Sequence, residues 1–84
     1  KAMMNEIVLL IASARFSGTV TGAAALEIFD VGGRRVRSFA IESGGFDLSW
    51  DLRDARGRRV SPGLYLARLG AADGVRVRRL LVAR

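Results

Sequence analysis

The stretch "FDLSWDLR", Phe46 to Arg53, alternates apolar and polar residues without a break. A period of two is typical of a β-strand that hides one face and wets the other. We expect its apolar face to supply the centre of the core through Phe46, Leu48 and Trp50. Trp50 has the largest side chain of the three and is expected to anchor that core.

Turn signals recur at short intervals on both sides of this stretch, and the segments between them have the length of strands. This regular spacing predicts an all-β fold, a single antiparallel β-sandwich of about seven strands. No segment with the period of a helix competes with these strands. The turn signals are Gly32-Gly33, Ser43-Gly44-Gly45, Asp54 to Gly57, Ser61-Pro62-Gly63 and Asp73-Gly74.

The neighbouring strands contribute further core residues. We expect Leu26 and Ile28 of "ALEIFD" and Tyr65 of "GLYLARLG" to face inward. In "VRVRRLLVAR" the apolar positions change phase, and a β-bulge at Arg78-Arg79 would reconcile the two halves. On that interpretation Val75 and Val77 point inward, while Arg76 and Arg78 project into solvent.

The N-terminal stretch "NEIVLLIASA" has no polar face, because Ile7 to Ala12 are all apolar. We therefore divide the chain into residues 1–12, an apolar arm or extra strand, and residues 13–84, the sandwich itself. The segment either joins its own sheet or pairs with an open sheet edge of a neighbouring subunit. For the second arrangement the predicted interface residues are Ile7, Val8, Leu9, Leu10 and Ile11.

Composition narrows the possible functions. The 84 residues carry a net charge of +6, almost entirely from arginine, and they include no cysteine and no histidine. The serines have no recognisable basic partner, so we expect no enzymatic activity, no cofactor and no metal. The acidic loop that includes Asp51 and Asp54 lacks the ligand spacing of a calcium loop, so Asp54 and Gly57 are expected to form a structural turn.

The arginines are scattered, and most alternate with apolar residues or lie in turns, which favours a solvated surface. Nucleic-acid or polyanion binding remains a remote alternative. It would be favoured if Arg76 and Arg78 joined Arg35 and Arg37 in one continuous stripe. No segment is apolar over the length that a membrane-spanning helix needs, so no membrane span is expected.

Several motifs in order resemble the Ig-like modules at the C-termini of secreted bacterial proteins. The family includes type IX secretion sorting domains and the Ig-like domain of the flagellar hook-capping protein. One departure is Leu52, where the family usually has glycine. The motifs are Phe29-Asp30-Val31, Gly33-Arg34, Trp50-Asp51-Leu52-Arg53-Asp54 with Gly57, and Gly63-Leu64-Tyr65.

The resemblance implies an Ig-like β-sandwich without catalytic activity, secreted or displayed at the cell surface of a bacterium. It also implies a protein partner: secretion or anchoring machinery, a neighbouring domain, or copies of itself. Two functions stay open, a C-terminal sorting or anchoring module and a structural subunit that assembles into an extracellular filament by N-terminal strand exchange. The chain begins at Lys1, so we expect it to be processed or to be part of a longer polypeptide.

Overall fold

The computed structural model describes residues 7–10 and 13–83, and it is built entirely from strands and turns. Six strands of seven or more residues pair antiparallel, and a seventh, four-residue strand pairs parallel with the last one. The expected all-β fold of about seven strands is therefore confirmed. The strands are β1 (Ile7–Leu10), β2 (Ala14–Val20), β3 (Ala24–Asp30), β4 (Arg35–Ile41), β5 (Gly44–Trp50), β6 (Gly63–Ala71) and β7 (Gly74–Val82).

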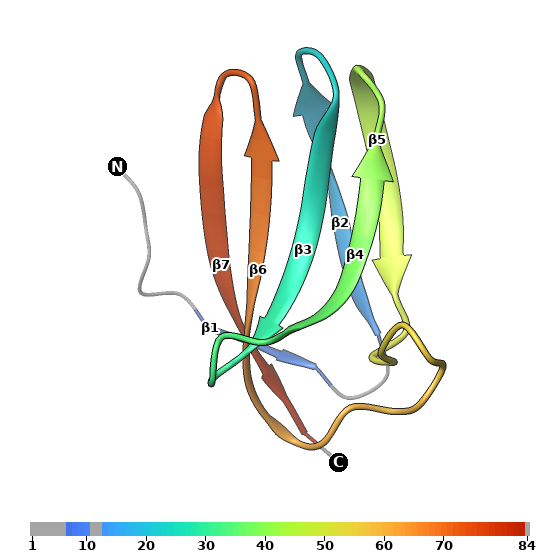
Figure 1. The fold of residues 1–84 in the computed structure, drawn as a ribbon, viewed down its shortest axis with the longest axis vertical. Coiled ribbons are helices and arrows are strands. Elements are labelled where there is room, and N and C mark those ends of the chain that lie inside the picture. The colour runs from blue at the N-terminus through green and yellow to red at the C-terminus, as the bar shows by residue number, and fades with distance from the viewer. Residues whose placement is uncertain (1–6, 11–12, 84) are drawn as a thin grey trace.

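The strands form two sheets of unequal size. One has five strands in the order β1-β7-β6-β3-β4, and the other has only β2 and β5. In Figure 1 the two-stranded sheet lies behind β3 and β4 and is displaced away from β7. The inner face of the five-stranded sheet is therefore covered by strands at one side and not at the other.

The core lies where the two sheets overlap. Leu26, Ile28, Trp50 and Tyr65 are buried there, and Trp50 and Ile28 are completely inaccessible. Phe46 and Leu48 are partly buried and pack against the same cluster. These are the residues that alternation alone placed on the inner faces of their strands.

Two hydrogen bonds fix the aromatic centre of this core. Trp50 Nε1 donates to the carbonyl oxygen of Arg53 at 2.8 Å, and the Tyr65 hydroxyl donates to the carbonyl oxygen of Ser61 at 2.7 Å. The two rings meet edge to face, with centroids 6.0 Å apart. Both polar atoms are thus satisfied, which is what a buried tryptophan and tyrosine require.

The connection after β3 is a tight turn, as the paired glycines predict. Gly33 has a φ of 91°, its amide donates to the carbonyl oxygen of Asp30, and the Asp30 carboxylate accepts the amide of Arg34. The β3–β4 pairing also contains a register shift between Ile28 and Phe29. This shift accounts for the irregular alternation in β4.

The last strand differs from its expected form. β7 pairs with β6 in one unbroken register, from Gly63↔Val82 to Ala71↔Gly74, so the predicted β-bulge is wrong. Val75 and Val77 are 54% and 40% exposed, whereas Leu80 and Val82 are buried. The inward placement of the two valines is therefore wrong. Arg76 and Arg78 are exposed to solvent, as predicted, but they lie on the inner face of the sheet and not on its outer face.

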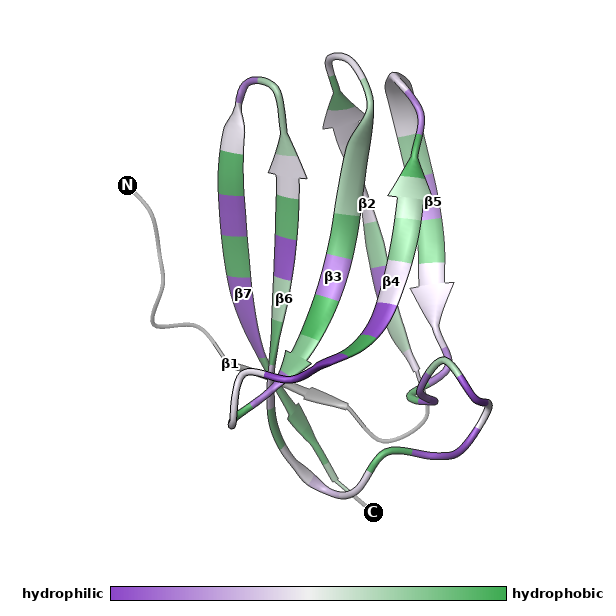
Figure 2. Ribbon diagram, in the orientation of Figure 1, coloured by the Kyte–Doolittle hydropathy of each residue, from purple (hydrophilic) through white to green (hydrophobic). Residues whose placement is uncertain are grey.

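The physical reason is that the inner face of β7 is buried along one part of the strand and exposed to solvent along the other. Even-numbered residues of this strand all face the interior side of the sheet, because side chains alternate across an unbroken strand. Leu80 and Val82 are buried on this face, but Arg76 and Arg78 are exposed there. Figure 2 shows the resulting alternation of hydrophilic and hydrophobic residues along the exposed half of β7.

Candidate interaction surfaces

The N-terminal segment lies at the edge of the five-stranded sheet. Ile7, Val8, Leu9 and Leu10 form β1 and pair parallel with residues 79–82 of β7. Ile11, the fifth predicted interface residue, lies outside the described residues. Within the single chain the segment thus joins its own sheet, and its role as an interface with another chain stays a prediction.

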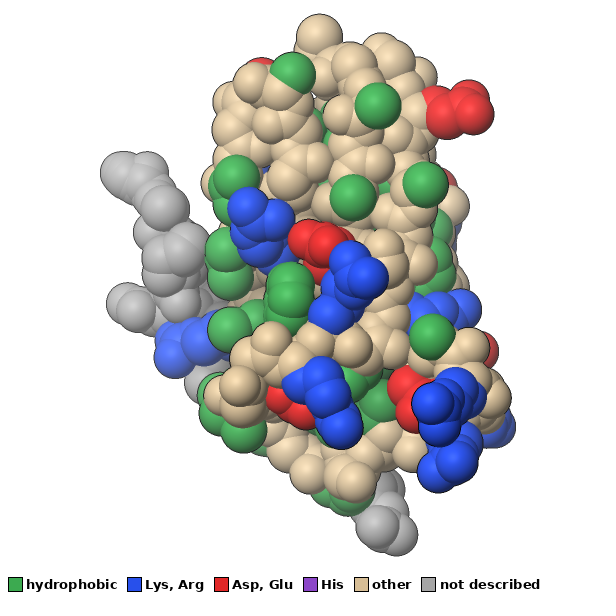
Figure 3. Space-filling view, in the orientation of Figure 1, with side chains coloured by type: hydrophobic (Ala, Val, Ile, Leu, Met, Phe, Trp, Pro, Cys, Tyr) green, Lys and Arg blue, Asp and Glu red, His purple; other side chains and the backbone are tan. Residues whose placement is uncertain are grey.

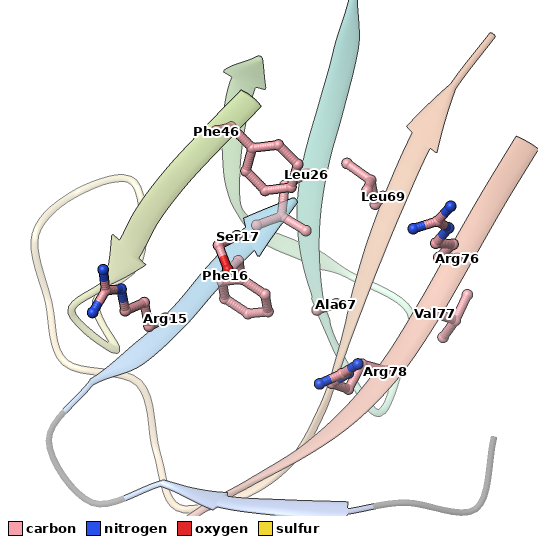
Figure 4. Close-up of a pocket in the computed structure, with 10 residues that line it drawn as sticks. All are labelled: Arg15, Phe16, Ser17, Leu26, Phe46, Ala67, Leu69, Arg76, Val77 and Arg78. Atoms are coloured by element: carbon pink, nitrogen blue, oxygen red, sulfur yellow. The ribbon is translucent and has the colours of Figure 1, made fainter. Parts of the chain in front are cut away.

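A groove opens between the two sheets where the second sheet ends. Its volume is about 250 Å³, and it is lined by residues of β2, β3, β5, β6 and β7 (Figure 4). Phe16, Leu26, Phe46, Ala67 and Leu69 supply apolar walls. The ring of Phe46 lies against Gly18 of β2, where an added Cβ would stand 3.3 Å from two ring carbons.

The polar side of the groove is basic. Arg15, Arg76 and Arg78 line it. Arg15 is engaged, since its Nε donates to Asp47 Oδ1 at 2.8 Å, and this hydrogen bond lowers the pKa of the Asp47 carboxyl below its ordinary value. Among the described residues, neither Arg76 nor Arg78 makes a side-chain hydrogen bond or ion pair.

The acidic loop after β5 has the predicted structural role. Asp54 Oδ1 accepts the backbone amides of Arg56 at 2.9 Å and Arg58 at 3.0 Å, and Gly57 adopts a φ of 86°. These amides lower the pKa of the Asp54 carboxyl, with the bond from Arg58 contributing most. The Asx turn and the glycine position are thus confirmed.

The two other candidate carboxylates in this region are also paired. Asp51 accepts hydrogen bonds from Arg37 and from the backbone of Arg53, and Asp47 pairs with Arg15. Within residues 7–10 and 13–83, no three His, Cys, Asp or Glu side chains gather closely enough to share a metal ion. The same residues contain no helix long and apolar enough to cross a bilayer.

The arginines do not form the continuous stripe that a polyanion site would favour. β4, which carries Arg35 and Arg37, and β7, which carries Arg76 and Arg78, are separated in the sheet by β6 and β3. Arg35 pairs with Glu27 at 2.9 Å. Figure 3 shows basic side chains dispersed among acidic and apolar ones over the visible face.

Sequence reasoning missed the groove altogether. The signal was present in the phase change along "VRVRRLLVAR", which the structure explains by cover and not by a bulge. An apolar strand that turns basic on its inner face, without a change of register, marks the place where the opposing sheet stops.

The two sheets define the chain as an all-β sandwich. No family model and no curated protein matches its sequence. Solved structures do share the fold. Dimeric, latent PorU from Porphyromonas gingivalis superposes with a TM-score of 0.66 at 22% identity, over 88% of this chain and 8% of PorU. PorZ of the same organism, an essential surface component of the type-IX secretion system, gives 0.58 at 26% identity, over 75% of this chain and 8% of PorZ.

The third similar structure is FlgD from Xanthomonas campestris, a protein of hook capping in flagellar assembly. It gives a TM-score of 0.57 at 27% identity, over 83% of this chain and 55% of FlgD. The chain thus spans only a part of each protein that it resembles. The two kinds of protein suggested by the motifs, type IX secretion and flagellar hook capping, are supported at the level of the fold.

Proposed function

We propose that this domain is a non-enzymatic β-sandwich module that acts by protein–protein contact, of the C-terminal sorting or anchoring type. The observation that carries the proposal is the likeness to PorZ, in which the shared fold occupies 8% of a surface component of a secretion system. A fold that forms so small a part of a larger protein is suited to serve as an attached module. The module would act outside the cell or at its surface.

A reporter fusion tests this function. The 84-residue chain is joined to the C-terminus of a periplasm-directed fluorescent protein in a bacterium that has a type IX secretion system. We expect the reporter at the cell surface or in the medium, and in the periplasm when the secretion system is deleted. Retention of the intact fusion in the periplasm of the wild-type strain would overturn the proposal.

A second candidate is a structural subunit that assembles by exchange of the N-terminal strand. It is favoured by the place of β1 at the edge of the sheet, where this four-residue strand pairs with β7 alone among the described strands. A strand held this way can pair with the equivalent edge of another copy, and a head-to-tail exchange that does not close builds a filament.

Deletion of residues 1–12 separates the two candidates. Strand exchange predicts that the full chain forms multimers, that the truncated domain is folded and monomeric, and that a peptide of residues 1–12 binds it. A full chain that stays monomeric at high concentration would exclude the assembly function. A truncated domain that unfolds would identify the segment as an internal strand.

A further inference from the structure

We propose that the groove between β2 and β7 binds an extended segment of a partner protein that carries two acidic residues at alternate positions. The segment adds to the free edge of β2 and directs its carboxylates to Arg76 and Arg78. This inference rests on the proposed function, because it gives the chemistry of the partner that such a module would contact.

The backbone at the mouth of the groove is available for pairing. β2 is hydrogen-bonded to β5 alone among the described strands, so its other edge is unpaired along that part of the chain. Phe16 and Ser17 of β2 line the same groove as Arg76 and Arg78, which shows that the free edge faces β7. An unpaired edge next to an apolar groove is the arrangement that strand addition uses.

The walls of the groove combine apolar side chains with arginines, so they suit an added strand whose side chains have an apolar stem and an acidic end. A strand added to β2 would lie over the uncovered inner face of β6 and β7, where Leu69 is registered with Arg76 and Ala67 with Arg78. Inward-facing glutamates can pack their methylene groups against these apolar residues while their carboxylates reach the guanidinium groups. Figure 4 shows both arginines on the wall formed by β7, across the groove from Phe16.

The spacing of the two arginines specifies the spacing of the acids. Arg76 and Arg78 lie two residues apart on the same face of one strand, roughly 6.5 Å along its axis. Carboxylates at alternate positions of an added strand have the same separation and also share a face. Neither arginine has an ion-pair partner among the described residues that would compete for the incoming acid.

The occupant is a partner segment and not a second copy of these 84 residues. No two of the eight acidic residues are separated by a single residue, so no segment of this sequence offers the required pair. The net charge of +6 also opposes association through a basic groove. The acidic residues are Glu6, Glu27, Asp30, Glu42, Asp47, Asp51, Asp54 and Asp73.

The test uses the full chain and the labelled peptide TVTETETVT, followed by fluorescence anisotropy. We expect saturable binding, with amide chemical-shift changes along β2 and at residues 75–78. The charge-reversed peptide TVTKTKTVT should not bind. Only alternate amides of an added strand face its partner, so peptides with blocked amides are tested in both phases: TVTEPETVT, and TVTETETVT with N-methyl groups on both glutamates. One of the two should bind poorly, because it lacks the donors that face β2.

Variants on the protein side locate the contact. Arg76→Gln with Arg78→Gln should weaken binding about tenfold, while the matched control Arg56→Gln with Arg58→Gln should leave it within about twofold. Arg76→Glu with Arg78→Glu should lose the acidic peptide and gain TVTKTKTVT. Since both positions are exposed, the melting temperatures should stay close to that of the wild type.

Three results would overturn the proposal: no binding of TVTETETVT, equal binding to the Arg76/Arg78 variants, or undiminished binding of both peptides with blocked amides. Displacement of TVTETETVT by a peptide of residues 1–12 would instead assign the groove to a second copy. If the reporter fusion is secreted and the peptide does not bind, the groove inference fails while the proposed function stands.

Discussion

Leu52 combines a left-handed backbone with a completely buried side chain. Its φ is 62°, the only positive φ of a non-glycine residue in the part of the chain that the structure describes. A residue with a Cβ pays about 1–2 kcal/mol for that conformation, which explains why glycine suits the position in the resembling family. Here the side chain is fully buried in the core, and its burial offsets the backbone strain.

We expect glycine and alanine to be almost equally destabilising at position 52. Leu52→Ala should lower the free energy of unfolding by about 2–5 kcal/mol, because it empties a buried site. Leu52→Gly removes one more methyl group but relieves the strained φ, so the two effects nearly cancel. Urea denaturation measures both values.

Leu80 is the matched control, since it is equally buried but lies in a regular strand. There glycine should be worse than alanine by about 1–2 kcal/mol, from the lost methyl group and the added backbone freedom. If glycine were worse than alanine by the same amount at both positions, the left-handed backbone of Leu52 would carry no cost in free energy.

Asp54 links the stability of its loop to pH. Its carboxylate accepts two backbone amides, which hold its pKa below the ordinary value of 3.8. A lowered folded-state pKa means that the contribution is complete above the unfolded pKa and is lost as the pH falls through the folded one. Acid should therefore weaken the loop.

We expect the free energy of unfolding to fall as the pH drops from about 5 to about 2, and to fall less steeply in Asp54→Asn. The asparagine keeps an acceptor oxygen and has no charge to lose. Asp73→Asn is the control, because that exposed carboxyl makes no hydrogen bond within the described residues. Parallel pH profiles for the wild type and Asp54→Asn would contradict this account.

At the scale of elements, β7 shows that a change in burial along one face of a strand can produce the same sequence pattern as a β-bulge. A change of phase in the apolar pattern arises either from a bulge, which turns the strand over, or from a change in what lies against one face. The alternation of apolar and polar residues cannot distinguish a bulge from a change of packing, because it records only the polarity of each residue. The unbroken β6–β7 register settles the matter in favour of cover.

This account predicts opposite sensitivities for two residues of the same strand. Leu80→Ala should cost about 2–5 kcal/mol, and Val77→Ala, on the open face, less than about 1 kcal/mol. Thermal or urea unfolding of the two variants gives the comparison. If Val77→Ala lowered the free energy of unfolding more than Leu80→Ala, Val77 would face the core and the strand would have to contain the bulge.

The strands themselves were predictable where one rule dominated. β5 alternates cleanly because one of its faces meets the core along its length, and that alternation places Trp50 on the buried face. The pairing of β1 with β7 was not predictable, since an apolar segment without alternation gives no register. The groove was missed because it depends on the widths of two sheets, which no single strand records.

At the scale of the whole molecule, the net charge is +6, but the arginines that supply it lie on separate strands and do not form one patch. Arg37 pairs with Asp51, and Glu27 accepts from both Arg35 and Arg68, so several cations are already neutralised locally. Arg76 and Arg78, the arginines of β7, are separated from the arginines of β4 by β6 and β3. A nucleic-acid strand would therefore meet separate charges and not one track.

This arrangement predicts weak binding to single-stranded DNA with a shallow dependence on salt. Each phosphate contact contributes a slope of about −0.7 to a plot of log affinity against log salt concentration. We expect a slope of about −0.7 to −1.4 and no measurable binding at about 0.15 M salt, because only one or two contacts can form together. Anisotropy titrations of a labelled oligonucleotide at several salt concentrations provide the measurement, and Arg76→Gln with Arg78→Gln tests whether the residual contacts involve the groove. A slope steeper than about −4 would require six or more simultaneous phosphate contacts, and the remote alternative of a polyanion partner would then replace the protein partner proposed for the groove.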